Sequence, residues 1–330
     1  MNYKPIIIVA GEPFSIFIEI FFKALKENRF KHPIVLIVSK NLMIKQMKKL
    51  KINHKFFLIN KNNFDLAKLN NSRTYIIDVD FSFKKPFEKI TNKSKKYISK
   101  CFKIASTLLK KNECAGLING PISKRHFLSG NFPGITEYLA YETNTKDNVA
   151  MLIYNKKLSV SPLTTHLPLK NVHKYLSKSK IVKQVKLIVN FYYKKFNKKP
   201  KIAITGLNPH CESNFETSEE KKIIIPAINY LIKNKYKVSG PFAADTIFLK
   251  EQSKNYDVII GMYHDQVLTP IKTIFGFDAI NITLGLPYIR ISPDHGPNFS
   301  MLGKNISNPK SLVSALKFFD NKWLLKQKKV

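Results

Sequence analysis

Short apolar runs rich in β-branched residues recur along this chain and alternate with longer segments whose apolar residues follow helical spacing. Runs of this length and composition predict buried strands. Alternation of such strands with helices is typical of an α/β fold. We expect strands at Ile6–Ala10, Ile34–Val38, Tyr75–Val79, Gly116–Asn119, Val149–Tyr154, Ile202–Gly206, Val258–Gly261 and Ala279–Thr283. Helical spacing predicts helices over Lys95–Lys111 and Ser177–Lys195.

Three of the apolar runs end in a polar turn that carries a histidine. The runs LSVSPLTTH, KIAITGLNPH and DVIIGMYH end at His166, His210 and His264. Ligands of open α/β sheets bind beyond the carboxyl ends of the strands. Three imidazoles there, with positions left open, would form a catalytic divalent-metal site. The alternative for each is an ordinary hydrogen-bonded histidine, because no local metal motif such as HExxH supports them.

Length and composition indicate a folded protein of two domains or one large one. The chain has 330 residues and is 44% hydrophobic, which is enough for a sizeable core. Its three cysteines form no CxxC and indicate a reducing compartment. The amino terminus does not have the pattern of a signal peptide, and no run of eighteen apolar residues occurs. We therefore expect a cytoplasmic protein with no membrane partner.

The formal net charge of +34 suggests nucleic-acid binding, but the kind of basic residue argues against it. The chain has 52 Lys and only 4 Arg, which together make the 56 basic residues. Recognition of bases and phosphates favours the bidentate fork of Arg. We expect nonspecific polyanion binding at low salt, and no specific nucleic-acid partner.

Four polar blocks follow or connect the predicted strands. They are INGPISK (118–124), GLNPH (206–210), GPFAADTIF (240–248) and the long segment YHDQVLTPIKTIFGFDAINITLGLPYIRISPDHG (263–296). In the third block, Asp245 lies where a helix is expected to begin and could cap it. In the fourth, Lys272 and Arg290 suit an anionic substrate, because both can bind phosphate or carboxylate.

These blocks resemble the 4-hydroxythreonine-4-phosphate dehydrogenase family in order and spacing, from about residue 5 to about residue 315. The YHDQ…NITLGLP-x-IR-x-S-x-DHG segment carries most of the specificity of the match. The resemblance implies two α/β/α domains with a cleft between them, as in isocitrate and isopropylmalate dehydrogenases. It also implies a homodimer whose active site lies at the interface. On this basis we expect a first domain of residues 1–125 plus 270–330 on the cofactor side, and a second of residues 126–269 on the metal and dimer side.

The resemblance further implies a reaction and the residues for it. The family oxidises the C3 hydroxyl of 4-phosphohydroxy-L-threonine with NAD, and the β-keto acid decarboxylates to 3-amino-2-oxopropyl phosphate during pyridoxal 5'-phosphate biosynthesis. Carried over to this sequence, the metal ligands are His166, His210 and His264. The substrate-binding positions are Thr136, Lys272, Asn281 and Arg290. The metal remains open among zinc, cobalt, magnesium and manganese.

The proton acceptor is open between two aspartates. Asp245 and Asp265 are both candidates, alongside Lys272 as a third catalytic residue. Their alternative roles are a helix cap for Asp245 and an orienting partner of a histidine for Asp265. The resemblance places the cofactor at the loop 294–309, with Asp294, His295, Gly296 and Ser300 as the expected contacts for NAD or NADP.

The sequence also departs from the family pattern. The Gly-rich first loop reads GEPFSIFIE (11–19), Ile135 replaces a histidine, the segment after GLNPH reads CESNFETSEE, and Ser300 replaces an aspartate. Two alternatives follow. One is a dehydrogenase of a related phosphorylated sugar acid, 4-phosphothreonate or 4-phosphoerythronate. The other is a metal-binding homologue without catalytic activity.

Overall fold

The computed structural model describes residues 3–60, 64–146, 148–211, 216–276, 278–293 and 296–320. The chain divides into two compact units: unit 1 is Met1–Tyr138 with Pro287–Val330, and unit 2 is Leu139–Leu286. The sequence led us to expect limits near residues 125 and 270. The segment 270–286 lies in unit 2 because its strand β11 (Ile280–Leu284) pairs with β6 (Ala150–Tyr154) of that unit.

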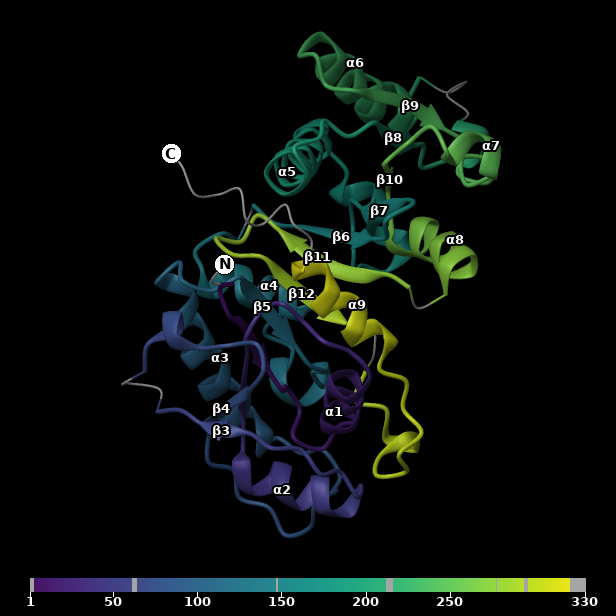
Figure 1. The fold of residues 1–330 in the computed structure, drawn as a ribbon. Helices are drawn as coiled ribbons and strands as arrows, with labels where there is room; N and C mark the ends of the chain where they lie inside the picture. Colours follow the sequence, from purple (N-terminus) through teal and green to yellow (C-terminus); the bar gives the residue numbers. More distant parts are fainter. Residues whose placement is uncertain are drawn as a thin grey trace. The chain divides into compact units, whose positions relative to one another are not determined.

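Unit 1 is built on a parallel sheet in the order β3-β4-β2-β1-β5-β12. Its strands are β1 (Ile6–Val9), β2 (Ile34–Val38), β3 (Phe57–Leu58), β4 (Thr74–Asp78), β5 (Gly116–Asn119) and β12 (Arg290–Pro293). Its helices are α1 (Phe17–Glu27), α2 (Lys40–Lys49), α3 (Ser94–Lys110) and α9 (Lys310–Phe319), and α4 (Ile135–Glu142) crosses the unit limit. All four residues of β1 are fully buried, as a central parallel strand requires. The chain returns to this unit at its end, where β12 pairs with β5 and α9 packs on α1 (Figure 1).

Unit 2 has a mixed sheet in the order β11-β6-β7-β10-β8-β9. Besides β6 and β11, its strands are β7 (Ser159–Pro162), β8 (Ile202–Thr205), β9 (Val238–Phe242) and β10 (Val258–Gly261). Its helices are α5 (Lys178–Phe196), α6 (Ile225–Lys233), α7 (Lys250–Ser253) and α8 (His264–Phe275). The pairs β11–β6 and β6–β7 are antiparallel, whereas β7, β10, β8 and β9 run parallel. Helix α8 packs on β7 and β10, and Figure 1 shows it in light green beside them.

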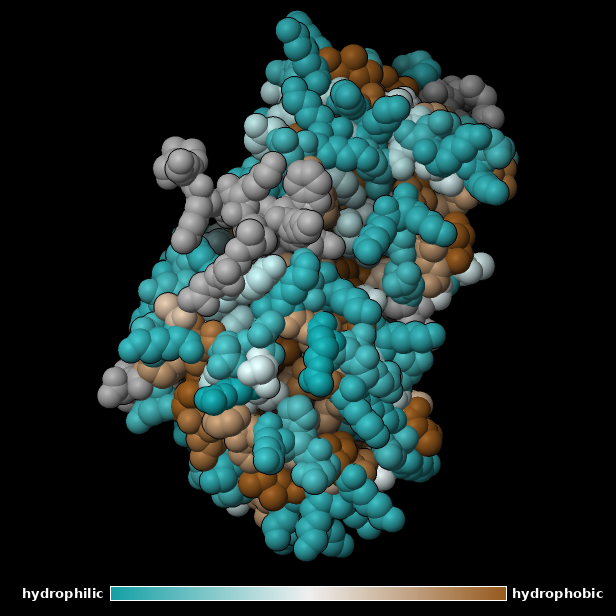
Figure 2. All heavy atoms as spheres, viewed as in Figure 1, coloured by the Kyte–Doolittle hydropathy of each residue, from teal (hydrophilic) through white to brown (hydrophobic). Residues whose placement is uncertain are grey.

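The expected α/β class is confirmed, and the predicted strands lie within one residue of the observed ones. The strand β7 was expected from the run LSVSPLTTH that ends at His166, and the strands β3, β9 and β12 were not predicted. β3 has two residues, β9 is only partly buried, and β12 begins with the charged Arg290, so none of them reads as a continuous apolar run. Hydrophilic residues cover most of the face seen in Figure 2, although a few charged side chains, Glu12 and Arg290 among them, are buried. Within the described residues, no helix is long and apolar enough to cross a membrane.

Candidate active site

The three histidines selected from the sequence follow three neighbouring strands of unit 2. His166 follows β7, His210 follows β8, and His264 is the first residue of α8 after β10. Because β10 lies between β7 and β8 and all three run parallel, their carboxyl ends meet at one edge of the sheet. The fold therefore carries all three imidazoles to the edge where α/β sheets bind ligands.

His166 and His264 lie side by side at this edge. Their ring centroids are 6.2 Å apart with an interplanar angle of 35°. His264 Nδ1 is 2.6 Å from Asp265 Oδ1, which leaves Nε2 as the nitrogen available to a ligand. Two imidazoles that bind one ion at about 2.1 Å have ring centroids roughly 5–6 Å apart. The observed 6.2 Å is slightly wider than this range, so the two rings would have to draw together to share one divalent cation. The donor chemistry of the pair suits such an ion, and Asp265 is the orienting carboxylate.

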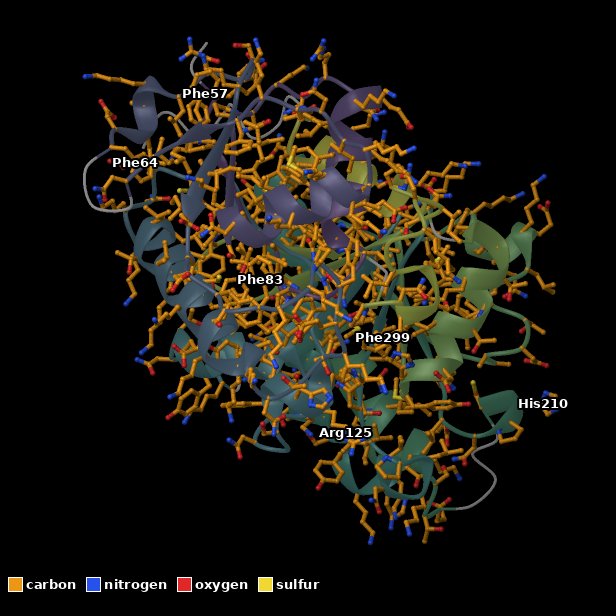
Figure 3. All side chains as sticks on the ribbon, turned by 90° about the horizontal axis from the view of Figure 1, so that it is seen from below. Phe57, Phe64, Phe83, Arg125, His210 and Phe299 are labelled. Atoms are coloured by element: carbon orange, nitrogen blue, oxygen red, sulfur yellow. The ribbon has the colours of Figure 1, made fainter. Side chains whose placement is uncertain are left out.

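His210 is placed differently. Its backbone is left-handed, with φ of +55°, and its side chain is 73% exposed, projecting from the rim of the molecule in Figure 3. Its Nδ1 is 4.0 Å from Asp245 Oδ2. Among the described residues, no group of three His, Cys, Asp or Glu side chains is arranged to hold a metal ion. The single chain therefore pairs His166 with His264 and His210 with Asp245, and β10 keeps the turns after β7 and β8 two strand spacings apart.

The two candidate proton acceptors have distinct surroundings. Asp265 contacts His264, as the role of an orienting partner requires. The expected helix start at Asp245 is wrong, because α7 begins at Lys250 with Leu249 as its N-cap. The segment around Asp245 forms turns instead, since it follows the edge strand β9 and presents the carboxylate to His210.

The remaining unit 2 candidates are Lys272 and Asn281. Lys272 lies in the last turn of α8 and is exposed. Asn281 lies on β11 and is half-buried, and its Oδ1 is a buried acceptor with no hydrogen-bond donor among the described residues. That oxygen can accept a bond from a ligand hydroxyl or amine.

Unit 1 contains a buried polar cluster around Arg290, the first residue of β12. Arg290 is 0% exposed; its Nε donates to Asn119 Oδ1 at 2.7 Å and its Nη1 to Thr136 Oγ1 at 3.4 Å. Burial lowers the pKa of Arg290 to about 10, against opposing effects of Tyr288 and Glu137. The fold thus brings together Thr136 and Arg290, both selected from the resemblance, and adds Asn119 at the end of β5.

The loop after β1 carries a buried carboxyl group that the sequence did not single out. Glu12 is 1% exposed and lines a small cavity with Gln46 and Tyr97. Burial raises its pKa from 4.5 to about 7, although the Ser94 side chain and the Ser123 backbone act to lower it. Neutral and charged forms of Glu12 are therefore both accessible near neutral pH.

The bulky residues of this loop turn inward. Phe14, Ile16 and Phe17 are all at most 5% exposed and belong to the core of unit 1. Gly11 has φ of +80°, and a Cβ there would lie 2.4 Å from the carbonyl oxygen of Pro121. The first loop is therefore held against the loop after β5 by close backbone packing that only glycine allows.

The expected cofactor contacts lie in the loop after β12. Asp294 and His295 lie outside the described residues. Gly296 and Ser300 are exposed, and Ser300 Oγ donates to Asn298 Oδ1 at 3.2 Å on the 3-10 turn Phe299–Met301. Phe299, labelled in Figure 3, is 56% exposed on the same turn.

Sequence reasoning missed the buried polar residues that brace the site. Gln266, Glu220 and Asn119 are all at most 9% exposed and each bonds to a segment that carries a candidate residue. Only their positions gave an indication: Gln266 is two residues after His264, and Asn119 ends a strand before Gly-Pro. Amide and carboxyl side chains are normally exposed, so composition does not reveal which are buried.

Comparisons with known proteins relate most of the chain to one family. Residues 29–319 match the family model described as "Pyridoxal phosphate biosynthetic protein PdxA". The chain is similar to a 4-hydroxythreonine-4-phosphate dehydrogenase from Sulfurihydrogenibium sp., with 37% identity over 94% of this chain and 95% of the relative. It is 30% identical to the D-threonate 4-phosphate dehydrogenase of Salmonella typhimurium, over 96% of this chain and 98% of that protein.

A solved structure gives the same result for the fold. The crystal structure of 4-hydroxythreonine-4-phosphate dehydrogenase from Klebsiella pneumoniae superimposes with a TM-score of 0.81. The two chains are 28% identical, and the match covers 96% of this chain and 98% of that one. The likeness extends through both units and is not confined to a single motif.

Proposed function

The chain belongs to the pyridoxal phosphate biosynthetic protein PdxA family, and on that premise we propose that it oxidises the C3 hydroxyl of 4-phosphohydroxy-L-threonine with NAD. The β-keto acid formed then loses carbon dioxide to give 3-amino-2-oxopropyl phosphate, a precursor of pyridoxal 5'-phosphate. The observation that carries the proposal is the adjacent pair His166 and His264, braced by Asp265, at the carboxyl edge of a sheet in a chain of this family.

The imidazoles of His166, His264 and His210 would hold the divalent cation. When bound, such a cation lowers the pKa of a substrate hydroxyl and polarises the ketone that replaces it. Imidazole donors suit zinc and cobalt, and magnesium or manganese can be held where substrate oxygens complete the coordination. Asp265 fixes the ring of His264 by accepting from Nδ1, and this directs Nε2 outward.

We assign the proton transfer to Asp245. Its carboxylate is 60% exposed and faces His210, whereas Asp265 is engaged with His264. An exposed carboxylate beside a ligand histidine can take the proton that leaves the C3 hydroxyl as hydride moves to the nicotinamide. Lys272 supplies a cation for the phosphate or carboxylate, and Asn281 Oδ1 accepts a bond from the substrate.

Arg290 and Thr136 are buried, and we propose that they support the substrate region from within unit 1. The Arg290 guanidinium is buried and shared between Asn119 and Thr136, so it contributes a fixed positive charge to the substrate region. The loop with Gly296 and Ser300 is proposed to contact the adenosine of NAD or NADP, together with Asp294 and His295. Ser300 stands where the family has an acidic residue, which bears on the choice between the two cofactors.

We further propose that the active form is a homodimer in the cytoplasm. His210 is exposed and separate from the His166–His264 pair, which is the arrangement expected if each metal site takes ligands from two protomers. Cys101, Cys114 and Cys211 are free thiols, in keeping with a reducing compartment.

A second substrate has its own support. Ile135 begins α4 beside Thr136, at a position where the family carries a histidine. The D-threonate 4-phosphate dehydrogenase from Salmonella typhimurium matches 96% of this chain. An apolar Ile135 removes one polar contact near the substrate, so a hydroxy acid in place of the amino acid is the alternative substrate.

The deciding experiment measures formation of reduced nicotinamide. 4-Phosphohydroxy-L-threonine and D-threonate 4-phosphate are each supplied with NAD and then NADP, before chelation, after it, and after metal is restored. We expect metal-dependent turnover of the amino acid with NAD. Faster turnover of the hydroxy acid would make the second candidate correct. No turnover of either by folded, metal-loaded protein would support a catalytically inactive homologue.

The metal assignment is tested by His210→Ala. We expect loss of both tight metal binding and turnover. Full turnover by this variant contradicts the assignment of His210.

A further inference from the structure

The three turns that carry the histidines are joined by one chain of hydrogen bonds. Met262, the residue that follows β10, is its centre. The Met262 carbonyl accepts from the Thr164 amide at 3.2 Å and from Thr164 Oγ1 at 2.8 Å, two residues before His166. The Met262 amide donates to Gln266 Oε1 at 2.7 Å, which ties the turn before His264 to the first turn of α8.

Gln266 extends this chain to the third turn. Its Nε2 donates to the carbonyl of Gly206 at 2.9 Å, at the start of the GLNPH turn that carries His210. Its Oε1 also accepts from Thr205 Oγ1 at 3.0 Å, at the end of β8. The Gln266 side chain thus bonds both to the turn before His264 and to the turn that carries His210. It is 9% exposed.

The bonding pattern fixes the orientation of the amide. The Met262 amide needs an acceptor and the Gly206 carbonyl needs a donor, whereas the Thr205 hydroxyl can either donate or accept. Only Oε1 toward Met262 and Nε2 toward Gly206 satisfy all three groups. Met262 and Gly206 are both buried, so water cannot replace these bonds without opening the turns.

Space around the amide is restricted as well. A Cβ at Gly261 would lie 3.0 Å from Gln266 Oε1 and 2.4 Å from a Val267 methyl. A Cβ at Gly206 would lie 2.7 Å from Cys211 Sγ. A side chain at position 261 would therefore press on Gln266 and Val267. A side chain at position 206 would press on Cys211, in the turn that carries His210.

We infer that Gln266 is a positioning residue, which holds the His210 and His264 turns of one protomer in a fixed relation and so orients both histidines for the metal sites to which they contribute. The inference rests on the proposed function, because it assumes that these histidines bind the metal. Its hydrogen bonds go to the Met262 amide, the Gly206 carbonyl and the Thr205 hydroxyl, so Gln266 acts on the histidines through the turns that carry them. An outer-shell partner of this kind typically changes metal affinity about 10–100-fold when it is removed.

The test uses the full-length protein and cobalt(II) as the probe. Gln266→Met keeps the volume and removes all three bonds. We expect the cobalt dissociation constant to rise about 10–100-fold, with an altered visible absorption spectrum of the bound cobalt. The matched control is Tyr192→Phe, which removes a buried bond to Ser159 Oγ in the same unit, at the amino end of β7. We expect the control to lose stability while its cobalt affinity and spectrum stay as in the wild type.

Thr205→Val provides a milder variant should Gln266→Met fail to fold. It removes only the hydroxyl bond to Gln266 Oε1, and we expect a smaller rise of the cobalt dissociation constant in the same direction. The inference is overturned if the folded Gln266→Met variant keeps the wild-type cobalt affinity and spectrum. If only Thr205→Val folds, the same result in that variant overturns it. Either result would leave the proposed metal site intact. Failure of the wild-type protein to bind cobalt would overturn the proposed metal site, and this inference with it.

Discussion

Arg290 and Asn119 form a buried pair in which Nε donates to Oδ1 at 2.7 Å. They lie on the neighbouring parallel strands β12 and β5, and both side chains are at most 2% exposed. The pair joins the returning C-terminal segment to the N-terminal part of unit 1. It therefore links the stability of the unit to a guanidinium that we place near the substrate.

Asn119→Leu should destabilise the protein strongly. The substitution removes a hydrogen-bond acceptor of a buried guanidinium, and leaving a buried donor without its partner costs about 1–3 kcal/mol, and more when the donor is charged. Denaturant unfolding at neutral pH measures the loss. Asn119→Asp keeps an acceptor oxygen and serves as the control, with a smaller expected loss. Equal stability of Asn119→Leu and the wild type contradicts the role of the pair.

Glu12 should make the folded state less stable as the pH rises from about 4.5 to about 7. Its folded pKa, about 7, lies above its ordinary value of 4.5, so the native state binds more protons than the unfolded state in this range. We expect Glu12→Gln to gain stability relative to the wild type between pH 4.5 and pH 8, by up to about 3 kcal/mol. Unfolding curves at both pH values give the difference.

The exposed Glu27 on α1 provides the comparison for Glu12. Glu27→Gln removes one exposed carboxyl group from the same unit and so controls for the loss of one carboxyl group as such. The same pH dependence in Glu12→Gln as in the wild type would show that the Glu12 carboxyl group is not perturbed by burial.

Lys195 on α5 should make the folded state more stable as the pH rises from about 7 to about 10.5. Burial lowers its pKa from 10.5 to about 7, so the unfolded state binds more protons between these values and stability rises with pH. We expect Lys195→Met to stabilise the protein most at pH 7 and below, by a few kcal/mol, with the gain shrinking toward pH 10. The adjacent exposed Lys194, replaced by Met, is the control for removing one lysine from α5. A pH-independent gain in Lys195→Met would exclude titration as the cause.

Glu220 should support the His210 turn at neutral pH and release it in acid. Its Oε1 accepts from the amides of Leu207 and Asn208 at 2.7 and 2.9 Å, and its Oε2 accepts from Asn208 Nδ2 at 2.8 Å. Burial acts to raise the pKa of Glu220, but the bonds from Asn208 and Leu207 outweigh it and lower the pKa overall. The stability it contributes is therefore present above its unfolded pKa and is lost as the pH falls through the lower, folded value.

Glu220→Gln tests this directly. The amide loses charge-assisted acceptance, so we expect the variant to be less stable at pH 7, by about 1–3 kcal/mol, and to approach the wild type below pH 4. The exposed Glu142 at the end of α4, replaced by Gln, is the control. Denaturation between pH 3 and pH 7 provides the measurement, and a constant difference over that range contradicts the role of the carboxylate.

The sequence by itself determined the α/β class and the positions of most strands, because their buried β-branched runs have no other stable environment. It also placed His166, His210 and His264 at strand ends, and the resemblance selected Thr136 together with Arg290. These features depend on short patterns of neighbouring residues, which can be recognised in the sequence alone.

The tertiary structure alone decided which of these residues meet. Strand order places β10 between β7 and β8, and so pairs His166 with His264 while His210 faces Asp245. It also buries Glu12 and Gln266, whose polar side chains give no sign of burial in the sequence. Contacts across strands and the desolvation of a carboxyl or amide group depend on segments that are distant along the chain, and no local pattern contains them.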